Sequence, residues 1–248
     1  MKFKPLLTTL ALSALPLIAF AGGTVTLEMG SGADKTRGQL EFDGSKIRMD
    51  AAGADEGYLL VHDQSAYAVT RQDGQTMVID LASMGKMFGG LVEQMGSELP
   101  GQDVSKFIGL KKTGRAETVA GIKGEVHLLT YVDDDGQQKT DELVLSSDPR
   151  LREMTQALFT LSHAMARAFG VKADQINGTD KLAKELLGSN SGILRMGSDF
   201  RVSSINAASP AAARFALPAA PQQMPDLGKI LQGQMPEGMP SLGDLMGR

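Results

Sequence analysis

The 248-residue sequence predicts an α+β protein in which short antiparallel strands and amphipathic helices share one apolar core. Two observations support this class. Between residues 24 and 81, apolar and polar residues alternate, and turn residues interrupt the alternation at short intervals. Two later stretches, residues 82–99 and 151–169, instead repeat apolar residues at steps of three and four, which is the period of a helix.

Residues 1–21 have the three parts of a secretory signal peptide. Lys2 and Lys4 form a positive start, residues 6–20 form a short apolar stretch, and the sequence Ala-Phe-Ala ends the segment as a cleavage pattern. The apolar stretch is shorter than the roughly 20 residues that a membrane-spanning helix needs. We therefore expect an exported protein without a transmembrane segment after processing, and an uncleaved membrane anchor is the alternative.

The first expected elements are six short antiparallel strands with one apolar face. Val25, Leu27 and Met29 lie on one side of the first strand, since side chains alternate along a strand. Ile47 and Met49 do the same after a tight Asp-Gly hairpin turn. The polar residues between them are expected to face water, as in a sheet with one buried face.

A first helix is predicted over residues 82–99, ending before Pro100. Met84, Phe88 and Met95 lie on its apolar stripe. The stretch also contains glycines, each of which costs about 0.5–1 kcal/mol relative to alanine inside a helix. We expect this helix to depend on docking and to act as a lid.

Further strands are expected at residues 115–119, 125–132 and 139–145. A second helix follows over residues 151–169, opened by Asp148-Pro149 and closed by a glycine. Leu158 and Met165 belong to its apolar stripe, which should face the sheet.

The last predicted elements are a short helix over residues 180–187 with Thr179 as its N-cap, and two strands around 193–196 and 200–205. The tail, residues 216–248, is rich in proline and methionine, and we expect it to be disordered or loosely docked. Within it, we expect Leu227, Ile230 and Leu231 to form at most one amphipathic turn, which is too short to be stable alone.

Composition excludes several classes of function. The chain has no cysteine, so it has no disulfide, thiolate metal site or lipid-modified N-terminal cysteine. Its formal charge is −4, and its basic cluster of Lys111, Lys112 and Arg115 is short, so we expect no nucleic-acid partner. Fourteen methionines and no tryptophan indicate a core of flexible side chains that could rearrange around a bound ligand. Methionine as ordinary core filler is the alternative.

No motif points to catalysis, a metal or a cofactor. His62, His127 and His163 form no pair at helical metal-ligand spacing, so a metal site or a catalytic triad would need tertiary convergence. The acidic run at residues 133–136 lacks the spacing of a calcium loop and favours a hairpin turn. The methionines of the tail could bind copper through their thioethers, but we expect them to make hydrophobic contacts instead. We expect a non-enzymatic protein.

The exported N-terminus and four segments of the chain together resemble a known group. These segments are GGTVTLEM, QLEFDGSKIRMD, TVAGIKGEVHLLTY and DFRVSSINAASPAAARFALP. Over roughly residues 23–220, the chain is similar to the exported domain of unknown function 4412 (DUF4412), a group similar in outline to periplasmic lipoprotein carriers of the LolA/LolB type. The resemblance implies a periplasmic location and a curved, half-open antiparallel β-barrel over residues 22–215, with helices covering its concave apolar face.

The same resemblance implies a hydrophobic cavity for acyl chains, and the expected role is non-enzymatic binding of a hydrophobic or lipid-like ligand. The expected ligand-binding residues are on the two helical stripes: Met84, Phe88, Met95, Leu158 and Met165. Their ordinary interpretation as plain core remains open. The alternative role is an interaction module of the cell envelope, in which the proline- and methionine-rich tail recruits a protein partner.

Overall fold

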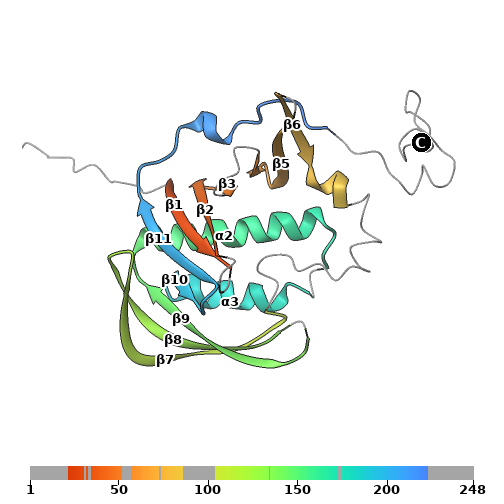
Figure 1. Ribbon diagram of the computed structural model, residues 1–248. Helices are drawn as coiled ribbons and strands as arrows, with labels where there is room; N and C mark the ends of the chain where they lie inside the picture. Colours follow the sequence, from red (N-terminus) through yellow and green to blue (C-terminus); the bar gives the residue numbers. More distant parts are fainter. Residues whose placement is uncertain are drawn as a thin grey trace, which may run out of the picture.

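The computed structural model describes residues 22–222 with gaps at 31, 33–34, 52–56, 73, 86–103, 134 and 173–174 (Figure 1). In this part of the chain, eleven strands form a single antiparallel sheet. The first six strands are β1 (Gly22–Met29), β2 (Thr36–Asp43), β3 (Lys46–Ala51), β4 (Gly57–His62), β5 (Ser65–Gln72) and β6 (Gln75–Asp80). The other five are β7 (Lys106–Val119), β8 (Ile122–Val132), β9 (Gln138–Ser146), β10 (Gly192–Met196) and β11 (Phe200–Asn206).

The sheet consists of two meanders joined at their centre. Strands β1 to β6 follow one another in space as they do in sequence, and so do β7 to β10. The two halves meet because β11 pairs with both β10 and β1. Strands β6 and β7 lie at opposite edges, so the sheet is open rather than closed into a barrel. The predicted combination of an antiparallel sheet with helices is confirmed.

Helix α2 (Pro149–Ala168) begins and ends where the sequence predicts. The carboxylate of Asp148 caps the helix, because Oδ1 accepts a hydrogen bond from the backbone N–H of Arg150 at 2.9 Å. At the other end, Gly170 has a φ of 70°, and Val171 N donates to Ala166 O at 2.9 Å. Glycine adopts this positive φ without strain, so Gly170 lets the chain turn out of the helix.

Helix α2 lies across the strands of one sheet face, and contacts β1, β5 and β10 (Figure 1). Two glycines let the backbone approach closely. A Cβ added at Gly192 would lie 2.2 Å from the carbonyl carbon of Leu151, and one added at Gly85 would lie 1.9 Å from Ala168 O. The helical residues 81–85 therefore pack against the C-terminal end of α2, as a docked first helix requires. The remainder of the predicted helix, residues 86–99, lies outside the described residues.

Helix α3 (Asn177–Gly188) packs against β7 and next to α2. It begins one turn before the predicted start, so Thr179 lies inside the helix and the predicted N-cap is wrong; the capping position is Ile176, without a side-chain cap bond. A Cβ at Gly178 would lie 2.2 Å from Val104 O, so the start of the helix is set by close packing on that segment. Strand β7 is also longer than the predicted residues 115–119.

After β11, the chain returns across the sheet to its far edge. We call residues 207–222 the strap; it contains a single 3₁₀ turn, η1 (Ala212–Phe215), which contacts β3 and β4 (Figure 1). Phe215 is fully buried. At the end of the strap, Gln222 N donates to Val78 O at 2.7 Å, which forms an isolated parallel bridge on β6. The first residues of the predicted tail are thus an ordered part of the sheet edge.

Candidate functional site

One face of the sheet is apolar from β1 to β5 and receives α2. Register places Leu40, Met49, Leu59 and Ala68 directly opposite one another on neighbouring strands, so they share this face. All four contribute to the main core cluster together with α2. The face is built by the period-two alternation of each strand, as the sequence predicts.

Part of this apolar face is only half-buried. Five residues of the layer between this sheet face and the helices are half-buried, and we call them the methionine face: Met29 and Met49 on the sheet, and Met84, Leu158 and Met165 on helical segments. Each packs against the buried cluster while keeping part of its side chain exposed among the described residues. Flexible, polarizable methionines suit a surface that adapts to an apolar guest.

Two methionine side chains of this face meet over a glycine. A Cβ added at Gly38 on β2 would lie 3.0 Å from Cε of Met29 and 3.7 Å from Cε of Met49. The absent side chain at Gly38 therefore makes room for two long thioethers from the neighbouring strands β1 and β3. A larger residue at this position would displace them, since protein cores are closely packed.

The structure describes three of the five predicted ligand-binding residues, and their role in ligand binding stays a prediction. Met84, Leu158 and Met165 all pack against the same core cluster. Phe88 and Met95 lie outside the described residues, so their predicted role stays a prediction. Met29 and Met49 were placed by the sequence on apolar strand faces but not among the ligand-binding residues; their pairing over a glycine depends on the register of three strands.

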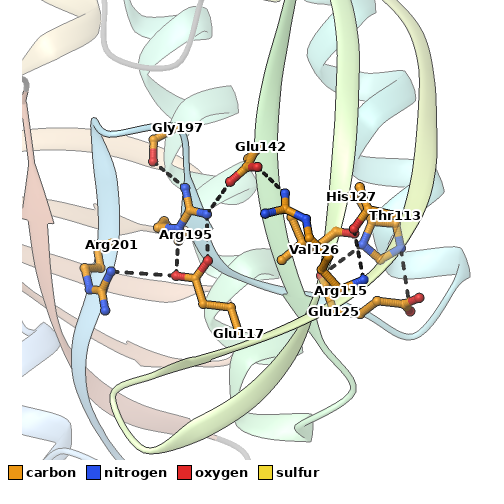
Figure 2. A network of polar contacts seen from close by, with 10 residues as sticks. All are labelled: Thr113, Arg115, Glu117, Glu125, Val126, His127, Glu142, Arg195, Gly197 and Arg201. Atoms are coloured by element: carbon orange, nitrogen blue, oxygen red, sulfur yellow. Dashed lines mark hydrogen bonds and ion pairs between the residues drawn. The ribbon is translucent and has the colours of Figure 1, made fainter.

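A second cluster of functional groups is polar and lies on the face of β10 and β11 turned away from α2. Arg195 and Arg201 stand opposite each other on these strands, while Val202 next to Arg201 belongs to the α2 cluster. Glu117 of β7 accepts two hydrogen bonds from Arg195, at 3.0 and 2.8 Å (Figure 2). Its Oε1 also lies 3.9 Å from Nη1 of Arg201. The tip of the β7–β8 hairpin is thereby attached to β10 and β11.

Glu142 of β9 extends this network. It accepts a hydrogen bond from Arg195 at 2.9 Å and another from Arg115 (Figure 2). The hydrogen bond from Arg195 holds the pKa of Glu117 below its ordinary value, and Arg115 does the same for the pKa of Glu142. Both carboxylates are therefore ionised near neutral pH, and the network is a structural clamp whose charges are paired.

The three histidines lie at three separate places. His127 Nδ1 is 3.0 Å from the carbonyl oxygen of Glu125, and His163 Nε2 is 2.7 Å from Asp180 Oδ1. His62 Nε2 lies 3.4 Å from Asp63 Oδ2. Among the described residues, no group of three or more histidine or acidic side chains could hold a metal ion. In the same part of the chain, no helix is both long and apolar enough to span a membrane.

Comparison with known proteins adds a loose structural likeness. No family model matches the chain, and no curated protein matches it. The crystal structure of MucB is similar at 15% sequence identity, covering 80% of this chain and 58% of that chain, with a TM-score of 0.32. The crystal structure of MucB in complex with MucA(peri) is similar at 16% identity over 80% and 54%, with a TM-score of 0.27. The chain thus spans less than two thirds of either MucB chain.

Proposed function

We propose that this protein is an exported, non-enzymatic binding protein of the periplasm that holds a hydrophobic or lipid-like ligand against the methionine face. The observation that carries the proposal is the half-buried state of Met29 and Met49 on the sheet face that receives α2, and of Met165 on α2 itself. An acyl chain that covers these side chains would remove apolar surface from water. Each Å² of apolar surface buried in this way contributes about 25 cal/mol to the binding free energy.

Three further features support the proposal. The signal-peptide pattern of residues 1–21 supports export. The resemblance of residues 23–220 to the DUF4412 group, and through it to LolA/LolB-type carriers, belongs to the same proposal and implies the same class of ligand. Packing of Gly85 against α2 supports the role of the first helical stretch as a docked cover for the ligand.

Native mass spectrometry of the full-length protein purified from the periplasm tests this function. We expect a fraction of the protein to carry an added mass that organic extraction releases as a lipid. A protein purified in parallel from the same periplasm controls for lipid carried through the preparation. Mass spectra showing only the bare chain in repeated preparations, together with no binding of added fatty acids, would overturn the proposal.

A second candidate function is supported by the end of the strap. Gln222 is fixed to β6 by two backbone hydrogen bonds, at 2.7 and 3.3 Å, so the tail that follows starts from a defined place on the sheet edge. A tail presented in this way could recruit a protein partner of the cell envelope. Pulldown from envelope extracts with the full-length chain and with a chain ending at residue 222 distinguishes the two, since only a tail-mediated partner is lost on truncation.

A further inference from the structure

The position of Gln222 determines where the tail can go. Its backbone N–H and C=O bond to Val78 and Asp80, at the last residues of β6. The neighbouring Ile79 lies opposite Ala68 of β5, and Ala68 packs against the main core cluster. Ile79 therefore shares the face of the sheet that carries Met49, and Gln222, which is paired through its backbone in the plane of the sheet, lies at the edge of that face.

The distance from this starting point to the methionine face is short. Residues 81–85, directly after β6, are helical, so Met84 lies only about 6 Å of helical rise beyond Asp80. Five residues of extended chain after Gln222 can reach at most about 17 Å. Leu227 can therefore reach Met84 without any movement of the sheet.

The composition of the tail fits an apolar surface. Leu227, Ile230 and Leu231 recur at the spacing of one helical stripe, and Met224 precedes them. The five residues of the methionine face offer thioether and aliphatic groups that are half-buried among the described residues. Apolar side chains that leave water on such a surface supply the driving force for docking.

We propose that residues 224–231 of this chain dock on the methionine face and compete there with the hydrophobic ligand. The competition rests on the proposed function, whereas the docking does not. A tethered segment needs little affinity, because its effective concentration near its own attachment point is in the millimolar range. The tail is thus an internal competitor that keeps the apolar face covered until a ligand displaces it.

Cysteine cross-linking tests the docking directly, because the natural chain contains no cysteine. The full-length variant with Met84→Cys and Leu227→Cys should form an intramolecular disulfide under mild oxidation, detected by peptide mass spectrometry. The control pairs Leu227→Cys with Arg71→Cys. Arg71 is exposed beside β6 and stands opposite Thr76, on the other face of the sheet, within reach of the same tail.

A disulfide to position 84 that forms at least tenfold faster than one to position 71 supports the docking. Equal rates for the two pairs, or a faster reaction at position 71, would overturn it. A second variant, Leu227→Cys with Met165→Cys, covers the case in which a cysteine at position 84 reacts poorly for local reasons. Slow disulfide formation at both position 84 and position 165 also overturns the proposal.

Titration with a fluorescent fatty acid tests the competition. A chain ending at residue 222 should bind the probe about three- to tenfold more tightly than the full-length chain, and replacing Leu227, Ile230 and Leu231 by serine should have the same effect. Replacing Gln232 and Gln234 by serine is the matched control and should leave the affinity unchanged. Equal affinity of full-length and truncated chains would overturn the competition, whereas no binding by either, with the position-84 disulfide present, would overturn the proposed function and leave the docking standing.

Discussion

Arg214 of the strap donates two hydrogen bonds to the carboxylate of Glu41 on β2, at 2.8 and 3.0 Å. Glu41 is only 5% exposed, whereas Arg214 remains partly accessible to solvent. The pair therefore holds the strap on the sheet and gives the buried carboxylate a hydrogen-bonded cation, since Arg48, opposite Glu41 on β3, makes its own hydrogen bonds to Asp50. Gln39 contributes a third hydrogen bond to Glu41, at 2.9 Å.

Replacing Arg214 by alanine should destabilise the protein, because it leaves the buried Glu41 carboxylate without its hydrogen-bonded cation. We expect a loss of about 2–4 kcal/mol in the free energy of unfolding, measured by urea denaturation. The exposed pair between Arg37 and Glu28 provides a control, and Arg37→Ala should cost less than about 1 kcal/mol. Similar losses for the two variants would contradict the role of the strap.

Replacing Glu117 by glutamine should weaken the clamp on the β7–β8 hairpin. A charge-assisted hydrogen bond contributes about 1.5–3 kcal/mol, so we expect a loss of about 1–2 kcal/mol at pH 7 for this partly exposed side chain. Thermal and urea unfolding measure the change. Glu125→Gln provides a control in a more exposed pair with Lys112.

The same variant predicts a change in acid stability. The hydrogen bond from Arg195 lowers the pKa of Glu117 in the folded protein below its ordinary value of 4.5. The stability that this group contributes is therefore present above its unfolded pKa and is lost as pH falls through the lower, folded pKa. The difference between wild type and Glu117→Gln should shrink as pH falls below about 4.5. A difference that stays constant through this range would show that the carboxylate charge is not responsible.

Replacing Gly85 by alanine should loosen the contact between residues 81–85 and α2. The new Cβ would lie 1.9 Å from Ala168 O, so the backbone would have to move, at a cost of about 1–3 kcal/mol. Gly188→Ala is the matched control, because a Cβ there meets nothing within 4 Å. Unfolding free energies should fall for the first variant and stay equal or rise slightly for the second, where alanine favours the helix. A neutral Gly85→Ala would contradict the close packing.

Much of the fold could be predicted from the sequence, because the relevant signals are local. Alternation in β1 and β3 identified the sheet face that carries Met29 and Met49. Asp148 and Gly170 marked both ends of α2, since capping depends on neighbouring residues. The first half of β7 was missed because a register shift between Phe107 and Gly109 interrupts the alternation there.

Contacts between distant parts of the chain could not be predicted in this way. Arg214 and Glu41 are 173 positions apart, and nothing local to either residue indicates the other. The clamp between Glu117 and Arg195 likewise depends on how far the β7–β8 hairpin bends toward β10. The start of α3 was misplaced by one turn because Gly178 packs against Val104, a contact set by tertiary structure.

The central claim is that the methionine face binds a hydrophobic ligand, and equilibrium titration with a fluorescent fatty acid measures this most directly. The titration compares the full-length protein with Met165→Glu and with Ser204→Glu, an exposed position that stands opposite Thr26. Circular dichroism establishes that each variant is folded. We predict saturable binding by the wild type and Ser204→Glu, weakened at least tenfold in Met165→Glu. Binding that is absent from the wild type, or equal in all three folded proteins, would contradict the claim.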